Sequence, residues 1–447
     1  MGDGPSTAGY NFSRWAEDWT KFRDPAKRTD WIDRLKYLPI AADGDVYLTL
    51  SGEARLRVNH TTNPDLRERR AQRQDIVRLV GGADLHLGEH VRVFGEVAHA
   101  GLGGVELGTP TTSLRNRLVV QQAFVDATTD IADVTVGARY GRQEFTDGAN
   151  LLISSRDNNT IRFVLNGIRA WARGPRVRVD LFDFKFTALG YGGTRDDRVD
   201  DLNRFSGVTT GIVLPANLFG EGQLYVDPFV WRLRSLDQAW GGVTAREARN
   251  YYGVHVWGDA GRATIDWTVN RQGGDFNGRR ISAWQVFLAQ TFALSDAKGS
   301  PRVGVHADYA SGGGAYGRGT LRNALAPFGN NIYYSYQLFA TPTNLVAVAP
   351  NVQFTPLKGV RAIAEYQFAW RDTATDAVYR ANGSPFAGTE RVDGHKFGEM
   401  ARLQLVWSIT PRLAFTGRYE HLTAGPVLRR AGYTSSDFFA GWLSFRF

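Results

Sequence analysis

Arginine recurs at every second position in several extended stretches of this sequence. In residues 46–59 ("VYLTLSGEARLRVN"), Arg55 and Arg57 share one face of an extended chain, while Ala54, Leu56 and Val58 share the other. Guanidinium groups bind carboxylates through parallel hydrogen bonds, so a row of them indicates anion recognition. The alternation gives these candidate anion-binding residues: Arg55, Arg57, Arg78, Arg139, Arg162, Arg302, Arg361 and Arg418.

Carboxylates occupy the same faces as these arginines, but in smaller number. Glu53, Glu365 and Glu420 are examples, and the formal net charge of the whole chain is +8. Salt bridges that brace neighbouring strands are one role for any individual arginine, and contact with a solute is the other. Because the positive charge is in excess, not all of it can be paired, and rings of arginine select anions in pores.

The elements that must hold these arginines are long amphipathic strands. Segments such as "RVGVHADY", "VRAIAEYQF" and "RLAFTGRYE" place apolar side chains on one face and charged ones on the other. No stretch approaches the roughly 18 consecutive apolar residues of a membrane-spanning helix, whereas 50 glycines and 12% aromatic residues favour an all-β protein. One apolar and one highly charged face predict strands that meet lipid outside and water inside.

The connections alternate between short and long, as in outer-membrane barrels. Residues 45–447 are therefore predicted to form a transmembrane antiparallel up-and-down β-barrel of about 18 strands. "SLDQAWGGVTAREA" and "RQGGDFNGR" are predicted to be two of the long loops, and "SGGGAYGRG" a flexible loop over the pore mouth. Residues 1–44 mix Trp, Pro and charge without alternation, which predicts short helical turns that plug or cap the periplasmic mouth. The alternative is a disordered tail.

The last segment, "SDFFAGWLSFRF", is predicted to be the strand that seals the barrel against the first one. Its terminal Phe and alternating aromatics also resemble the signal by which outer-membrane proteins are sorted for insertion, which makes the barrel-assembly machinery, outer-membrane lipid and lipopolysaccharide expected partners. Tyr251, Tyr252, Trp370, Trp407 and Tyr419 are predicted to lie at the headgroup interface, because a water-filled barrel would have no dry core.

Other kinds of chemistry have little support in the sequence. Cysteine is absent, the eight histidines are scattered, and no hydrolase or metalloprotease motif occurs, so we expect neither an enzyme nor a cofactor. Basic and aromatic residues lie on opposite strand faces, which argues against nucleic-acid binding. The acidic stretch 195–204 could hold calcium through Asp196, Asp197, Asp200 and Asp201, although a solvated external loop explains it more simply.

Several motifs resemble those of the alginate-export family of outer-membrane proteins. They are "DPAKRTDWIDRLKYLPIAADGDVYLTLSGEARLR", "GRQEFTDGANLLISSRDNNTIRFVLNGIRAW" and the C-terminal "RLAFTGRYEHLTAG". The resemblance implies an eighteen-stranded porin with an arginine-rich lumen, in a family whose best-known member secretes an anionic uronic-acid polysaccharide. It implies a constriction formed with Arg55 and Arg57 by two neighbouring strands, one ending in Arg139, Arg142, Gln143 and Glu144 and the other carrying Arg162, Asn166 and Arg169.

The sequence thus leads to a hypothesis of a passive outer-membrane channel for an anionic saccharide. An uptake porin for small anions, such as sugar or aromatic acids, is the alternative with the same barrel. A structural or cell-surface barrel, plugged by its loops and N-terminal segment, is a third. The identity of the cargo, the direction of transport, gating and the oligomeric state are left open by the sequence.

Overall fold

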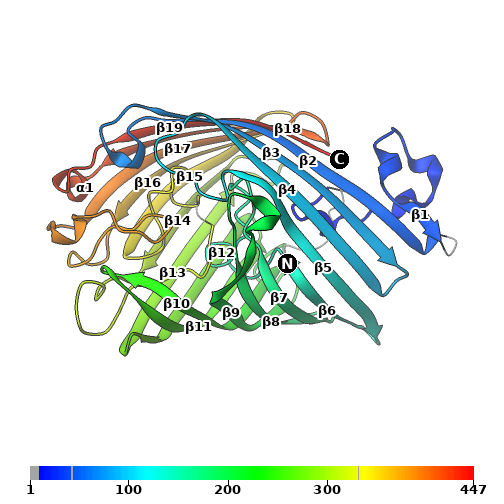
Figure 1. Cartoon of the computed structure of the whole chain (residues 1–447), viewed down its shortest axis with the longest axis horizontal. Coiled ribbons are helices and arrows are strands. Elements are labelled where there is room, and N and C mark those ends of the chain that lie inside the picture. Colours follow the sequence, from blue (N-terminus) through cyan, green and yellow to red (C-terminus); the bar gives the residue numbers. More distant parts are fainter. Residues whose placement is uncertain (1–9, 42–43, 331) are drawn as a thin grey trace.

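The computed structural model describes residues 10–41, 44–330 and 332–447, and its dominant feature is a closed barrel of eighteen antiparallel strands (Figure 1). Every strand from β2 to β19 pairs with its neighbours in sequence, and β19 pairs with β2 to close the sheet, with Leu443 opposite Leu56. Closure pairs the backbone polar groups of both edge strands, which a sheet in lipid requires. The predicted fold class and strand number are confirmed. Within the described residues, no helix is long and apolar enough to cross a membrane.

The wall of the barrel consists of long strands, and several shorter elements are not part of the wall. The barrel strands are β2 (Val46–Thr61), β3 (Gln72–Leu87), β4 (Val91–Val105), β5 (Asn116–Ile131), β6 (Val134–Gln143), β7 (Leu165–Arg173), β8 (Val177–Ala188), β9 (Arg198–Val213), β10 (Leu224–Trp240), β11 (Val243–Ala260), β12 (Ala263–Phe276), β13 (Arg279–Ala293), β14 (Arg302–Ala310), β15 (Leu345–Leu357), β16 (Val360–Trp370), β17 (Lys396–Ser408), β18 (Leu413–Ala424) and β19 (Ser436–Arg446). The elements outside the wall are the short strand β1 (Leu38–Ala41), the helix α1 (Pro426–Arg430) and the 3₁₀ turns η1 (Arg14–Ala16), η2 (Thr20–Arg23), η3 (Pro25–Lys27), η4 (Asp33–Leu35), η6 (Pro64–Leu66), η7 (Gly193–Arg195) and η8 (Thr389–Arg391).

Side-chain alternation gives the wall an apolar outer face and a polar inner face. On β19, Leu443 is 44% exposed on the outside, next to the equally lipid-facing Leu56 of β2, which is 59% exposed. Trp442 and Arg57, the adjacent residues on the same two strands, face the lumen and contact each other. Large apolar side chains exposed in this way are stable only against lipid.

The two rims of the barrel differ in the length of their connections. One rim, next to β1 and the C-terminus in Figure 1, carries mostly tight turns, and the other carries long segments at residues 144–164, 311–344 and 371–395. Two connections that were predicted to be long loops are two-residue turns. β10 and β11 join through Gly241 and Gly242 alone, and β12 and β13 through residues 277–278.

The reason for these two errors is turn chemistry. Gly241 and Gly242 have φ of 57° and 83°, and Asn277 and Gly278 have φ of 50° and 79°. Positive φ at both central residues defines the type I′ turn, whose twist matches that of a two-residue hairpin. Gly-Gly and Asn-Gly therefore mark tight hairpins, and the polar residues around them belong to the strands β10 to β13.

The interior of the barrel contains a dry core, contrary to prediction. Residues 144–164, 371–395 and the described part of 311–344 fold inward and bury apolar side chains against the wall, including β8 to β11 and β15 to β18. Tyr251 belongs to this core and is fully buried, whereas the adjacent Tyr252 is exposed on the outer face. The expectation that both tyrosines lie at the headgroup interface is wrong for Tyr251, because neighbours on a strand point to opposite sides.

The described part of the N-terminal segment forms 3₁₀ turns and β1, which pairs with the start of β2. Residues 10–17 extend into the lumen, where Trp15 contacts Phe124 and Arg14 forms ion pairs with Glu53 at 2.7 Å and Glu96 at 3.0 Å. Residues 1–9 and 42–43 of the predicted segment lie outside the described residues.

A charge placed on the outer face tests the assignment of that face to lipid. We expect Leu443→Arg to destabilise the barrel by up to about 4 kcal/mol, because a guanidinium that faces hydrocarbon is poorly solvated. Reversible urea unfolding from lipid vesicles measures this change, with Leu443→Met as the apolar control. Equal stability of the two variants would contradict the assignment.

Candidate functional site: an arginine-lined constriction

Five arginine side chains converge on Asp157 and Asn158, at the tip of the segment 144–164 inside the barrel. The Asp157 Oδ1 atom accepts hydrogen bonds from Arg78 and Arg162, both at 2.8 Å, and Oδ2 accepts one from Arg55 at 3.0 Å. The other two arginines, Arg57 and Arg418, contact Asn158. Burial alone would raise the pKa of Asp157, but the positive charges of Arg55, Arg78 and Arg162 outweigh it and hold the pKa well below its usual range.

Asn158 continues this arrangement with neutral oxygens. Arg57 donates to the carbonyl oxygen and to the side-chain oxygen of Asn158, both at 3.0 Å, and Arg418 donates to the same side-chain oxygen at 2.9 Å. Within the described residues, Arg57 and Arg418 form no ion pair with a carboxylate; their other partners are the amide oxygens of Asn59 and Gln404. These two guanidinium groups carry positive charge that no acid neutralises directly.

Regular strand pairing places these arginines side by side. Arg55 of β2 lies opposite Arg78 of β3, and Arg57 is the next inward-facing residue of β2. Across β19, Trp442 separates Arg57 from Arg418 of β18, and its ring lies 4.9 Å from each guanidinium carbon. Stacking on an aromatic face stabilises a cation without neutralising it, so the ring keeps the two positive charges in place.

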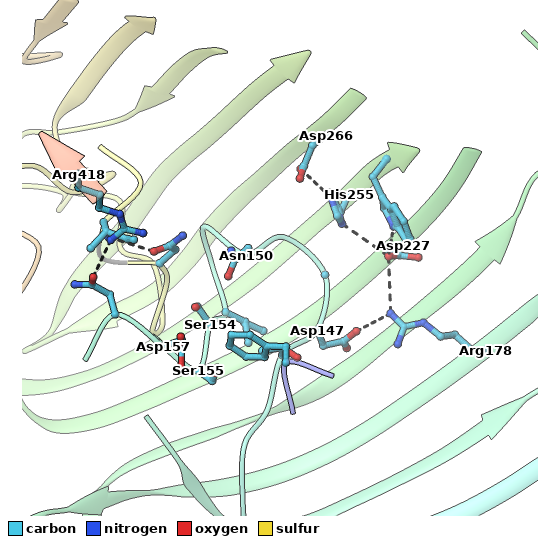
Figure 2. Close-up of a pocket in the computed structure, with 18 of the residues that line it drawn as sticks. Asp147, Asn150, Ser154, Ser155, Asp157, Arg178, Asp227, His255, Asp266 and Arg418 are labelled. Atoms are coloured by element: carbon cyan, nitrogen blue, oxygen red, sulfur yellow. Dashed lines mark hydrogen bonds and ion pairs between the residues drawn. The ribbon is translucent and has the colours of Figure 1, made fainter. Parts of the chain in front are cut away.

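A cavity of about 580 Å³ opens beside the constriction (Figure 2). One wall carries Arg55, Arg418 and Trp442, together with the Asp157–Asn158 tip. The opposite wall is built from β8 and β10 to β12 with one residue of the segment 144–164, and it carries Asp147, Arg178, Asp227, His255 and Asp266.

The charges of this second wall are paired with one another. Arg178 contacts Asp147 at 2.6 Å, and the Nε2 atom of His255 lies 2.9 Å from Asp266. The side chain of Asp266 is still 61% exposed. A ligand in the cavity would therefore meet an arginine surface on one side and hydrogen-bond acceptors on the other.

A second group of arginines lies apart from the constriction and is paired with acids. Arg139 donates to Asp126 at 2.6 Å, and its guanidinium contacts the rings of Trp15 and Phe124, each with its centre 3.8 Å away. Arg169 forms an ion pair with Asp180 at 2.7 Å. These arginines brace neighbouring strands and the N-terminal segment, which is the structural role considered for any single arginine.

Comparison with known proteins gives a family and a fold. A family model described as "Alginate export" matches residues 46–441. The chain belongs to the alginate export family. No curated protein sequence matches this alginate export family member, but solved structures do. OccK9 (OpdG) from Pseudomonas aeruginosa is 11% identical, with a TM-score of 0.57 and 89% of this chain and 98% of that chain covered.

Two further solved structures of Pseudomonas aeruginosa proteins resemble this alginate export family member. OccK2 (OpdF), in complex with glucuronate, is 10% identical, with a TM-score of 0.54 and 92% and 97% of the two chains covered. OpdK, with vanillate, is 10% identical, with a TM-score of 0.55 and 89% and 98% covered. Similarity at this level shows the fold alone. Family and fold together place this protein in the bacterial outer membrane.

Two residues that the family resemblance assigned to the lumen face the other way. Arg142 and Asn166 lie opposite each other on β6 and β7, and the Arg142 Nε atom donates to the Asn166 side chain at 3.0 Å. They share a face with Tyr140 and Ile168, which are exposed on the outside. Strand alternation therefore puts them outside the bore, and the assignment of both as pore-lining is wrong.

The other predicted residues lie inside the barrel at different depths. Arg162 precedes β7 rather than belonging to it, and its Nη1 atom donates to Glu144 at 2.6 Å. Arg302, the first residue of β14, donates to Thr291 at the rim with tight turns, and Arg361 lies one residue after the start of β16 at the same rim. The constriction therefore combines Arg55, Arg57, Arg78, Arg162 and Arg418, while Arg302 and Arg361 are remote from it.

Asp157 and Asn158 are the site residues that the sequence did not reveal. They occur in "SSRDNNT", which reads as an external loop because no local pattern shows that a polar loop turns into a barrel. The four aspartates of the acidic stretch bind separate partners, such as Lys185 for Asp201 and the Gly192 amide for Asp196. Within the described chain, no group of three or more His, Cys, Asp or Glu residues is arranged to hold a metal ion.

The dry core anchors the segment that carries the constriction. Phe328 of the segment 311–344 packs against Phe163 and Phe205, with ring centres 5.0 and 5.2 Å apart. We expect Phe328→Ala to cost about 3–5 kcal/mol of local packing free energy and to loosen residues 144–164. Hydrogen exchange in detergent measures the loosening, and the lipid-facing Phe292→Ala is the control. Unchanged protection of residues 144–164 in Phe328→Ala would show that this packing does not hold the tip.

Proposed function

We propose that this protein is a passive outer-membrane conduit for anionic saccharides, with the arginine constriction as its selective point. The observation that carries the proposal is the pair Arg57 and Arg418. Among the described residues, their guanidinium groups contact neutral oxygens and aromatic rings but no carboxylate. Fixed positive charge at a narrow point attracts anions and repels cations. The alginate export family, whose description names an anionic polysaccharide, supports the same cargo class.

A second candidate is uptake of small sugar acids or aromatic acids. The inward-folded segments leave a cavity of about 580 Å³, which is the size of a small-molecule site. The solved structures with glucuronate and vanillate contain small carboxylates bound to proteins of similar fold, which supports this candidate. Export of a polymer would require the segments 144–164 and 311–344 to leave the bore.

We also propose that the N-terminal segment plugs the periplasmic side of the same constriction. Arg14 contacts Glu53, and Glu53 in turn contacts Arg55 at 3.1 Å and Arg78 at 3.1 Å. Ser13 donates to Glu144 at 2.7 Å, and the ring of Phe12 lies 4.3 Å from the Arg162 guanidinium. The segment therefore reaches the arginines from the side opposite the external loops.

The remaining parts of the proposal concern the surroundings of the barrel. The apolar outer face fits outer-membrane lipid with lipopolysaccharide, and the C-terminal aromatic strand fits recognition by the barrel-assembly machinery. We infer no catalysis, because the charged groups of the lumen serve as ion pairs and anion contacts.

Block of current by a sugar acid tests the proposed function. We expect glucuronate, but not glucose, to reduce the single-channel current of the wild type in planar bilayers. In the double variant Arg57→Gln/Arg418→Gln, the half-blocking glucuronate concentration should rise about ten- to a hundredfold, because charge-assisted hydrogen bonds are lost.

The control for this experiment is Arg271→Gln. Arg271 is exposed on the outer face, where it stacks on Trp284, so its loss removes one arginine without changing the lumen. Equal block of the wild type and the double variant would show that the constriction does not bind the solute, and equal block by glucose would show that charge does not select it.

Deletion of residues 1–44 tests the plug and the third hypothesis, a barrel without transport. We expect the deletion to increase single-channel conductance severalfold while the barrel keeps its heat-modifiable migration in gel electrophoresis. Absence of conductance in both the full chain and the deletion variant would favour a structural or cell-surface role.

A further inference from the structure

The Asp157–Asn158 tip presents to the arginines a pattern of oxygens that a ligand could also present. The Asp157 carboxylate receives three hydrogen bonds from arginines, and the Asn158 side-chain oxygen receives two. The main-chain oxygens contribute as well, since Arg55 donates to the Asp157 carbonyl at 3.1 Å and Arg57 to that of Asn158 at 3.0 Å. One anionic group with neutral oxygens beside it is thus already bound at the constriction.

The tip takes this position at the cost of backbone strain. Arg156 has φ of 55°, the left-handed region that a side chain with a Cβ rarely adopts. A tight turn follows, in which the Asn159 amide donates to the Arg156 carbonyl at 2.9 Å. The Arg156 Nε atom donates to the carbonyl of Gly329 at 3.0 Å, which fixes the turn to the segment 311–344. Strain of this kind persists only where surrounding contacts compensate for it.

The tip also lies where a solute would meet it. Asp157 and Arg418 line the cavity of about 580 Å³ (Figure 2). Asn158 and Arg55 line it as well. The side chain of Asp157 is 27% exposed, whereas that of Arg78 behind it is 1% exposed. A solute in the cavity therefore reaches the tip before it reaches the inner arginines.

We propose that the Asp157–Asn158 tip is an internal substitute for cargo, which a hydroxylated carboxylate displaces from the arginine constriction. This inference rests on the proposed function. The ligand class follows from the tip: a carboxylate takes the place of the Asp157 side chain, and a neighbouring hydroxyl or ring oxygen takes that of Asn158. Uronates and other sugar acids have this pattern of oxygens.

Electrostatics explains why the exchange is selective. Removal of the tip alone would leave the three arginines Arg55, Arg78 and Arg162 with only two carboxylate partners in the described structure, Glu53 and Glu144. A buried positive charge that lacks its full compensation is costly. A carboxylate solute restores that charge balance as it enters, whereas a neutral sugar does not. Anions therefore displace the tip from the arginines, and neutral solutes do not. The same contacts both close the bore and select the cargo.

Asp157→Asn tests the inference, because it keeps the shape of the side chain and removes its charge. We expect a severalfold increase in single-channel conductance and an approximately tenfold decrease in the half-blocking glucuronate concentration, since the internal competitor is weakened. Asp65→Asn is the matched control: Asp65 is an exposed residue between β2 and β3, and its only ion pair in the described structure is with Arg69 at 3.6 Å.

Chemical restoration of the charge adds a second measurement. The chain contains no cysteine, so Asp157→Cys can be labelled at one position. An anionic sulfonatoethyl thiol reagent should return conductance and glucuronate block towards wild-type values, and a cationic trimethylammonium reagent should not. Asn158→Ala, which removes the acceptor shared by Arg57 and Arg418, should change both quantities in the same direction as Asp157→Asn.

The possible outcomes separate this inference from the proposed function. If glucuronate blocks the wild type and Asp157→Asn equally, with equal conductance, the tip is not a competitor and only this inference fails. Weaker block in Asp157→Asn would make the tip part of the cargo site and would overturn the inference as well. If glucuronate blocks neither the wild type nor any variant, the proposed function fails too.

Discussion

Guanidinium groups inside a protein need oxygen acceptors, and the inner wall of this barrel carries more of them than its own carboxylates can satisfy. Closure of the sheet forces these side chains into the bore, because the outer face must be apolar in lipid. The wall pairs some of them, as Asp126 does for Arg139 and Asp180 for Arg169. At the constriction the missing acceptors come from elsewhere in the chain, from the Asp157–Asn158 tip.

The shape of the interior follows from this requirement. The segment 144–164 reaches the arginines with its polar tip and packs its apolar residues, such as Phe145 and Leu152, against inward-facing aromatics of the wall. From the other side, Arg14 of the N-terminal segment contacts Glu53, which links it to the same arginines. One charged layer therefore joins the external segments, the wall and the N-terminal segment, and it is also the layer that a solute must cross.

Sequence alternation predicted the wall well because the physical signal is local. In a strand such as "SDFFAGWLSFRF", alternate residues face the lumen and the lipid, so the position of a residue in the strand predicts its face. Trp442 and Leu443 lie on the predicted faces. Prediction failed where the outcome depends on contacts distant in sequence. The inward folding of residues 144–164 and the burial of Tyr251 depend on packing between segments that are distant in sequence. The alternation of side chains along one strand cannot predict such packing.

The candidate site was predictable in part for the same reason. Alternation predicts an inward orientation for Arg55, Arg57, Arg78 and Arg418, and in the structure all four contact the tip inside the barrel. Their role in transport stays a prediction. Arg142 and Asn166 were assigned to the lumen by a family motif and not by alternation. They lie near strand ends, where a shift of one residue moves a side chain to the opposite face of the sheet. Two-residue turns such as Gly241–Gly242 could have been recognised from the sequence by their positive-φ residues.

The central claim is that the bore has a net positive constriction that selects anions. The reversal potential of the wild-type channel in a planar bilayer, under a tenfold gradient of potassium chloride, tests it most directly. We expect a reversal potential with the sign of chloride selectivity, which moves towards zero when Arg57 and Arg418 are both replaced by glutamine. A reversal potential with the sign of potassium selectivity in the wild type would contradict the claim.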